Sequence, residues 1–194
     1  MPVEKTKHRV LIVSSSDKAY DYFLKILPQK DFHPILRANR AGEAKRILLS
    51  SPIDIMIINT PLSDEFGIDL ALDSSDSCMG ILVMVKSEVY DQTVYTLEDN
   101  GILTLSKPNS VEAIYSAVKL LAATNKRITR FEKKIQTLKD KMNDIRTVNR
   151  AKWLLIENMN MAEKDAHYYI EKQAMDTRLS RREIAENIIR TYDK

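Results

Sequence analysis

Apolar residues in the first half of the chain fall into short, nearly continuous runs separated by amphipathic stretches. The runs are Arg9–Val13, Ile53–Ile58, Ile81–Val85 and Ile102–Leu105, with a weaker one at His33–Leu36. The stretches between them that have helical spacing are Lys18–Leu27, Ala41–Leu49, Asp69–Asp73 and Thr93–Asp99. Runs without polar alternation are typical of strands buried on both faces of a parallel sheet. The alternation therefore predicts an α/β fold with a doubly wound, five-stranded parallel sheet, whose functional crevice lies at the carboxyl ends of the strands.

The second half of the chain has a different pattern, which predicts helices throughout. All 4 glycines and all 6 prolines lie at or before Pro108, so no backbone breaker interrupts residues 109–194. Asn109, three residues before Glu112, is the predicted N-cap of a long helix. Once Thr124 fills one gap, apolar residues recur along this helix at alternating intervals of four and three: Leu121, Ile128, Phe131, Ile135, Leu138, Met142 and Ile145. Such a heptad seam needs a partner, and we favour a parallel homodimeric coiled coil over a lone helix packed on its own domain.

Two shorter helices are predicted after the long one. Asn160 and Ser180 each stand three residues before a glutamate, Glu163 and Glu183, which is typical of a capping box. Apolar residues of all three helices can enclose a small core: Ala151, Leu154, Leu155, Met159, Ala166, Tyr169, Ile170, Ala174, Ile184, Ala185, Ile188 and Ile189. We therefore expect an α/β domain over residues 1–120, a linker helix over 121–145 and a three-helix module over 146–194.

Composition and charge narrow the class of protein. Hydrophobic residues make up 44% of the chain and charged residues 29%, no apolar run is long enough to span a bilayer, and residues 1–7 hold no signal-peptide core. The single cysteine, Cys78, excludes an internal disulfide framework and a cysteine-cluster metal site. We expect a cytoplasmic protein that does not associate with a membrane.

Charge is distributed unevenly between the two halves. Residues 1–118 carry 12 Lys/Arg and 16 Asp/Glu, a balance of −4, whereas residues 119–194 carry 18 and 11, a balance of +7. A polyanion is the natural partner of the basic half, although a solvated lysine-rich helix surface has the same composition.

The first 120 or so residues resemble the receiver domain of response regulators, which has a CheY-like, flavodoxin-like fold. The segments that carry the resemblance are RVLIVSSSD, IDIMIINTPLSDEFGIDLA and LTLSKP. The resemblance implies an acidic pair that holds Mg²⁺ after the first strand and a phosphoacceptor aspartate after the third. It also implies a hydroxyl after the fourth strand and a lysine after the fifth, which together read the phosphorylated state.

This sequence departs from the receiver pattern at most of those positions. The corresponding residues are Ser14 and Ser15 for the acidic pair, Asn59 for the phosphoacceptor, Val85 or the adjacent Lys86 for the hydroxyl, Thr104 for the switching aromatic, and Lys107, followed by Pro108, for the lysine. An amide cannot form an acyl phosphate, and two serines make a poor site for a hard cation. Asp17 and Asp64 are interpreted as ordinary loop acids, and Asp54 as lying at the opposite end of the sheet. We therefore predict a degenerate receiver that is not phosphorylated by the aspartate route, and an unknown protein or ligand is left open as its signal.

Roughly the last fifty residues resemble the ANTAR domain, the RNA-binding module of AmiR- and NasR-type antitermination regulators. The resemblance is carried by Arg146–Lys152 with Leu154 and Leu155, by Met161–Ala166, by Gln173–Asp176 and by Arg182–Ile189. Trp153 is a departure, because many family members have glycine there, and we interpret it as covering the small core rather than stacking on a base. The resemblance implies binding to stem-loops of nascent transcripts and hence transcription antitermination.

Candidate RNA contacts follow from this resemblance and from helical spacing. Basic side chains hold phosphates, and aromatic or small side chains allow stacking or close approach. The candidates are Arg146, Arg150, Ala151, Lys152, Tyr168, Lys172, Gln173, Ala174, Met175, Arg178, Arg181 and Arg182. For each of them a solvated surface position is the alternative, and for Tyr168 the edge of the core.

Two other classes of function remain open at this point. Receiver domains also carry DNA-binding helix-turn-helix outputs, and the receiver-like domain can serve as a docking surface in a protein–protein adaptor. An enzyme is disfavoured, because His8, His33 and His167 are scattered and no nucleophile elbow or phosphate-binding glycine loop occurs. We expect neither a cofactor nor a metal.

Overall fold

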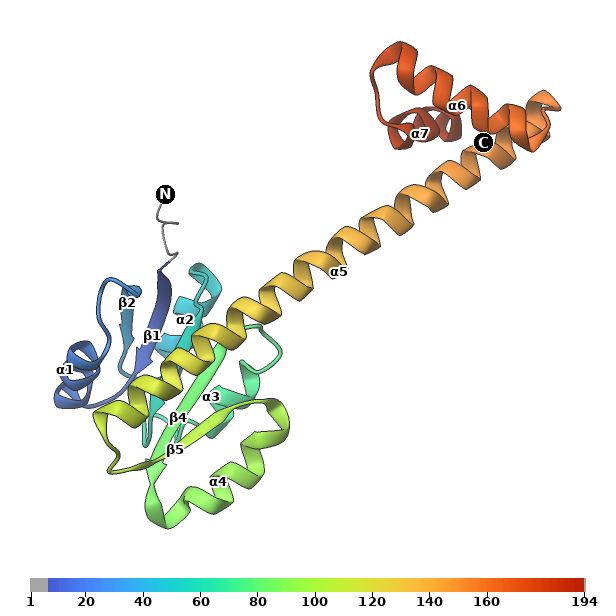
Figure 1. Ribbon diagram of the computed structural model, residues 1–194. Helices are drawn as coiled ribbons and strands as arrows, with labels where there is room; N and C mark the ends of the chain where they lie inside the picture. The colour runs from blue at the N-terminus through green and yellow to red at the C-terminus, as the bar shows by residue number, and fades with distance from the viewer. Residues whose placement is uncertain (1–6, 194) are drawn as a thin grey trace. The chain divides into compact units, whose positions relative to one another are not determined.

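The computed structural model describes residues 7–193 and divides into two compact units, Met1–Arg130 and Phe131–Lys194. The helix α5 (Val111–Met159) runs from the first unit into the second (Figure 1). Both domain boundaries expected from the sequence, after residues 120 and 145, therefore fall inside one continuous helix. No helix within residues 7–193 is long and apolar enough to cross a membrane.

Five parallel strands form the sheet of the first unit, in the order β2-β1-β3-β4-β5. Their bounds are β1 His8–Val13, β2 Phe32–Ala38, β3 Ile55–Asn59, β4 Gly80–Lys86 and β5 Leu103–Lys107. The apolar runs of the sequence thus become strands, and the predicted doubly wound fold is confirmed. Because all strands are parallel, their carboxyl ends meet at one edge.

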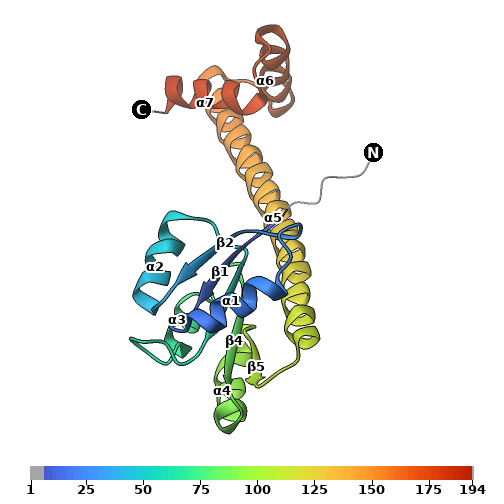
Figure 2. The same cartoon turned by 90° about the vertical axis from the view of Figure 1, so that its left-hand side faces the viewer.

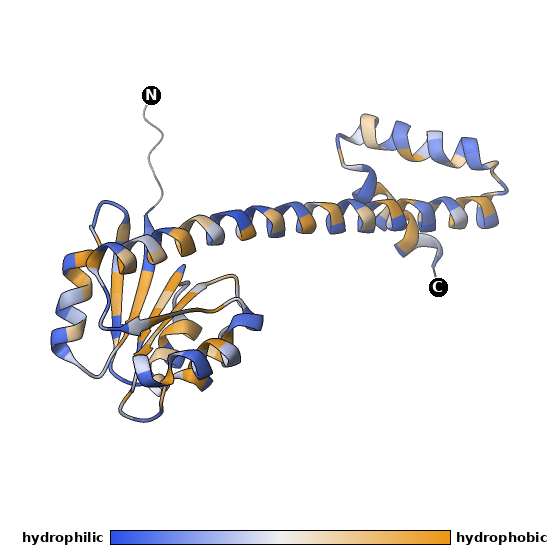
Figure 3. Ribbon diagram, turned by 60° about the horizontal axis from the view of Figure 1, so that its bottom comes forward, coloured by the Kyte–Doolittle hydropathy of each residue, from blue (hydrophilic) through white to orange (hydrophobic). Residues whose placement is uncertain are grey.

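Helices cover both faces of this sheet (Figure 1, Figure 2). The bounds are α1 Asp17–Ile26, α2 Ala41–Ser50, α3 Ile68–Asp73 and α4 Tyr90–Leu97, with short 3-10 turns η1 Ser87–Val89 and η2 Glu98–Asn100. Alternate residues of β1 show the two cores: Leu11 and Val13 pack with α2, α3 and α4, while Val10 and Ile12 pack with α1 and α5. The strands are accordingly the most hydrophobic part of the unit (Figure 3).

The first turns of α5 belong to the core of the first unit. The hydroxyl of Ser110 accepts a hydrogen bond from the backbone N–H of Ala113 at 3.1 Å, so Ser110 rather than Asn109 caps the helix. Leu121, predicted as the head of the coiled-coil seam, is buried here instead. Its Cβ would lie 2.9 Å from a Cβ added to Gly80, so glycine permits this close approach. The exposed seam therefore begins at Ile128.

The second unit is a three-helix module built from the end of α5, α6 (Glu163–Thr177) and α7 (Arg181–Tyr192). Its buried residues all belong to the predicted core: Ala151, Leu155, Ala166, Ile170, Ile184, Ala185 and Ile188. Met159, also predicted there, is 43% exposed, so that part of the prediction is wrong. The capping box of Ser180 and Glu183 is confirmed. The one expected at Asn160 is wrong, because that residue has a φ of 53° and the N-cap of α6 is Ala162, which makes no side-chain cap.

Candidate strand-end pocket and nucleic-acid interface

Three of the predicted pocket residues form one hydrogen-bond network at the carboxyl ends of β1, β3 and β5. The Lys107 ammonium donates to Asn59 Oδ1 at 2.9 Å and to the backbone oxygen of Thr60. The Asn59 amide donates in turn to the hydroxyl of the fully buried Ser14 at 3.1 Å. Burial, and to a smaller extent the charge of Lys86, lowers the pKa of Lys107 below its ordinary value. The network holds a single cation and no carboxylate.

The other two predicted pocket residues do not join this network. Ser15 is exposed and donates to the backbone oxygen of Pro61 at 3.3 Å. Val85 is fully buried and offers no polar atom, whereas Ser87, which the sequence reasoning missed, donates its hydroxyl to the Lys107 carbonyl at 3.0 Å. A hydroxyl two residues after the end of an apolar run was the available signal. Thr104 is buried, and its hydroxyl has no hydrogen-bond partner among the described residues.

The three aspartates considered in the sequence analysis are engaged by other groups. Asp17 pairs with Arg37, and Asp54 accepts from the backbone N–H of Arg9 at 2.7 Å at the opposite end of the sheet. Asp64 accepts from the backbone N–H groups of Ala41 and Gly42 at 2.9 and 3.0 Å, which lowers the pKa of its carboxyl. Within residues 7–193, no cluster of three or more histidine, cysteine or acidic side chains is placed to hold a metal ion.

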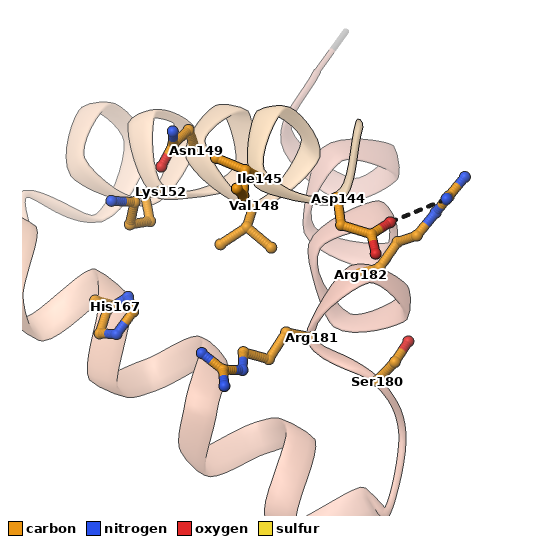
Figure 4. A pocket seen from close by; sticks show the side chains of 9 residues that line it. All are labelled: Asp144, Ile145, Val148, Asn149, Lys152, His167, Ser180, Arg181 and Arg182. Atoms are coloured by element: carbon orange, nitrogen blue, oxygen red, sulfur yellow. Dashed lines mark hydrogen bonds and ion pairs between the residues drawn. The ribbon is translucent and has the colours of Figure 1, made fainter. Parts of the chain in front are cut away.

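In the second unit, a cleft of about 530 Å³ opens between α5, α6 and the start of α7 (Figure 4). Val148 of α5 faces His167 and Arg181 across it, and Lys152 and Arg182 lie at its sides. The cleft is therefore basic, with an apolar wall.

Most basic residues around this cleft are already paired with acids. Arg182 contacts Asp144 at 3.0 Å and Glu186 at 2.8 Å, and these bonds raise the pKa of its guanidinium. Arg181 pairs with Glu171 at 2.9 Å and Lys152 with Glu163 at 3.2 Å. Outside the cleft, Arg150 pairs with Asp193. Four of the predicted RNA contacts thus also tie the helices of the module to one another.

A second group of predicted contacts is exposed and unpaired. Arg146, Lys172 and Arg178 make no ion pair with any described residue. On α6, Lys172 lies between Tyr168 and Met175, whose side chains are 62% and 68% exposed. These three are spaced by four and three residues, so they share one face of the helix. Lys164, four residues before Tyr168, extends the stripe and was missed by the sequence reasoning, although its spacing was a usable signal.

The remaining predicted positions are mixed. Ala151 is fully buried in the module core and cannot contact a ligand, so that prediction is wrong. Ala174 is half-buried against the core, and the half-buried Gln173 accepts at its backbone oxygen from Thr177 at 2.6 Å. Trp153, interpreted as core packing, is 70% exposed and lines a second cleft of about 470 Å³. The interpretation of Trp153 is therefore wrong.

Comparison with known proteins agrees with both units. Residues 136–189 match the model of the ANTAR domain. The transcriptional regulatory protein PdtaR of Mycobacterium tuberculosis is 26% identical over 184 residues, covering 94% of this chain and 90% of that protein. The aliphatic amidase regulator of Pseudomonas aeruginosa is 22% identical over 141 residues, covering 71% of each chain.

Solved structures support the fold of the first unit. A signal receiver domain of an HD domain-containing protein from Pseudomonas fluorescens matches with a TM-score of 0.59 at 15% identity, covering 67% of this chain and 98% of that one. A two-component transcriptional regulator from Clostridium phytofermentans matches with a TM-score of 0.58 at 19% identity, covering 62% and 97%. The chain thus combines a receiver-like N-terminal fold with an ANTAR domain, and it is similar over most of its length to transcriptional regulators.

Proposed function

We propose that this protein is a transcription antitermination regulator that binds RNA stem-loops through its C-terminal module, and that its receiver-like domain is not phosphorylated on an aspartate. The match to the ANTAR domain and the similarity to transcriptional regulators support the class. The observation that carries the proposal is the α6 stripe, defined as Lys164, Tyr168, Lys172 and Met175.

The chemistry of the α6 stripe fits an RNA loop. Proteins that read RNA stack unpaired bases on aromatic faces and hold the adjacent phosphates with lysine and arginine. Tyr168 offers the exposed ring, and Lys164 and Lys172 flank it on the same helix face. Arg178, exposed at the end of α6, extends the positive charge. The excess of 18 Lys/Arg over 11 Asp/Glu in residues 119–194 supplies a favourable field for any polyanion.

The exposed α5 seam supports a homodimer. Ile128, Phe131, Ile135, Leu138, Met142 and Ile145 are all exposed in the single chain. Isoleucine at the first apolar position of a heptad and leucine at the second, as in Ile135 and Leu138, favour a coiled coil of two parallel helices. A second copy of this chain is therefore the proposed occupant of the seam, and two modules in one dimer would raise the affinity for an RNA with two hairpins.

The strand-end network supports a receiver without phosphorylation chemistry. Asn59 presents an amide where an acyl phosphate would form, and Ser14 offers a hydroxyl where a carboxylate would bind Mg²⁺. Lys107 already uses Asn59 and Thr60 as acceptors. Regulation by an unknown protein or ligand at this unit remains part of the proposal.

Ultraviolet crosslinking of the full chain to RNA in cells, followed by sequencing of the recovered fragments, tests the proposed function. We expect fragments that fold into paired hairpins, with better binding to two hairpins than to one. Lys172→Ala should lower the slope of log affinity against log salt by about one, as expected for one lost phosphate contact. Lys25→Ala, the same change on the exposed face of α1 in the first unit, should leave the slope unchanged.

Two results would contradict the proposal. Tighter binding to duplex DNA than to the recovered hairpins at matched salt would favour a DNA-binding regulator. Absence of crosslinked RNA, with the three-helix module still folded, would favour a protein–protein adaptor.

A further inference from the structure

Between residues 131 and 146, the residues that flank the α5 seam are mainly basic. With Ile135 and Met142 as the first apolar positions of their heptads, the flanking positions between 131 and 146 are occupied by Glu132, Lys134, Lys139, Lys141 and Arg146. Four of these five residues are basic, and all five are exposed. Coiled coils that are stabilised at their flanks normally place opposite charges there.

In a parallel pair of α5 helices, the residue immediately before the first apolar position of a heptad faces the residue five positions later in the other copy. Lys134 of one copy then faces Lys139 of the second copy, and Lys141 faces Arg146. Twofold symmetry repeats both contacts on the other side of the seam. Both contacts bring like charges together, whereas Glu132 of one copy faces Arg127 of the second copy. Like-charge contacts therefore outnumber opposite-charge contacts two to one along the seam, which weakens the association that the apolar residues favour.

No described acid of the same unit pairs directly with these basic residues. Within residues 7–193, none of the four basic flanking residues makes an ion pair, and the Lys134 ammonium lies 6.0 Å from the centre of the Phe131 ring. The two acids nearest in the helix are engaged by other groups. Asp140 accepts from Gln136 at 2.8 Å, and Asp144 pairs with Arg182 at 3.0 Å.

We propose that the paired α5 helices form a phosphate-binding strip, consisting of Lys134, Lys139, Lys141 and Arg146 of both copies, and that RNA lying along it stabilises the dimer. This inference rests on the proposed function, which supplies both the RNA and the second copy. A linear polyanion fits because the strip is a row of charges along a helix rather than a pocket. By linkage, RNA tightens the dimer by the same factor by which dimerisation tightens RNA binding.

Sedimentation equilibrium of the full chain tests the strip, with and without a short blunt-ended RNA duplex. Lys134→Glu turns its contact with Lys139 of the second copy into an attraction and should tighten the RNA-free dimer by about tenfold at low salt. Lys133→Glu is the matched control, because the same charge change lies on the outward face of α5, and it should leave the dimer constant unchanged. Raising the salt from about 0.01 M to about 1 M should tighten the wild-type dimer and loosen the Lys134→Glu dimer.

The double variant Lys134→Glu with Lys139→Glu restores a like-charge contact, now between acids, and should weaken the dimer again. The RNA duplex should tighten the wild-type dimer but not the double-variant dimer. The strip is refuted if all variants match Lys133→Glu, or if the duplex tightens every variant equally, since the modules alone would then bridge the copies. Equal tightening by polyglutamate would refute RNA as the occupant.

The outcomes separate this inference from the proposed function. A wild-type chain that binds the crosslinked hairpins and dimerises, but whose flank variants show no effect, refutes the strip alone. A wild-type chain that stays monomeric with and without RNA refutes both the strip and the dimer, whereas hairpin binding by that monomer would leave the RNA-binding proposal standing.

Discussion

We expect the three-helix module to be the less stable of the two units, and substitution of Leu155 tests this expectation. Leu155 is 1% exposed and belongs to the buried core of the module, together with Ala151, Ala166, Ile170, Ile184, Ala185 and Ile188. Replacing a buried leucine by alanine costs about 2–5 kcal/mol, depending on how far the remaining side chains move into the cavity. A single core in a domain of this size rarely supplies more than about 3–5 kcal/mol.

Leu155→Ala should therefore leave α6 and α7 largely unfolded near room temperature while the sheet of the first unit remains intact. Leu154→Ala is the matched control, since it makes the same chemical change at an adjacent, half-buried position. We expect it to cost less than half as much, because part of that side chain already contacts water.

Hydrogen exchange of the full chain, followed by mass spectrometry of peptides, measures both effects in one experiment. Peptides from α6 and α7 should lose protection in Leu155→Ala and keep most of it in Leu154→Ala, while peptides from β1 and β3 stay protected in both. Equal loss in the two variants would show that burial in the module does not decide its stability. Loss of protection in β1 and β3 would show that the chain unfolds as one cooperative body.

Three further predictions concern the receiver-like unit. Gly67→Ala should destabilise it by about 2–4 kcal/mol, because φ is 104° and an added Cβ would lie 2.9 Å from Ile58 Cγ2. Thermal unfolding measures this effect. It should be smaller for the control Gly101→Ala, where φ is also positive but nothing lies within 4 Å of the added Cβ. The folded pKa of Asp64 lies below the ordinary value of 3.8, so the stability that its carboxylate contributes is complete above that pH and is lost as the pH falls through the lower folded pKa. The melting temperature should therefore fall more steeply with acid in the wild type than in Asp64→Asn. Parallel curves would contradict a stabilising role for the Asp64 carboxylate. Acetyl phosphate with Mg²⁺ should leave the intact mass unchanged, because Asn59 has no carboxylate, and an added phosphoryl group would overturn the degenerate-receiver proposal.

The fold was largely predictable because its signals are local. Apolar runs marked all five strands, since strands buried on both faces need continuous apolar residues. Ser180 and Glu183 marked the start of α7 because a capping box is a short-range contact. The same local rule failed at Asn160, where the chain enters a left-handed conformation and the helix begins three residues later.

The site was less predictable because exposure and pairing are tertiary properties. Leu121 continues the heptad spacing of the seam, yet the sheet of the first unit covers it. Trp153 looked like a core residue by size and is exposed, whereas Ala151 looked like a point of close approach and is buried. Spacing within one helix cannot reveal which face a second helix covers.

Ion pairing with acidic residues also decides how much each basic residue of the module can contribute to RNA binding. A cation such as Arg181, already held by Glu171 at 2.9 Å, must exchange one carboxylate for a phosphate, and that exchange adds little net charge attraction. A cation such as Lys172, which no described acid neutralises, brings its whole charge to the complex and releases counterions from the RNA. The amino-acid sequence alone does not distinguish paired from unpaired cations. The positions of the acidic residues in the folded module do. The affinity should therefore be concentrated on the α6 stripe, while the paired arginines hold the helices that present it.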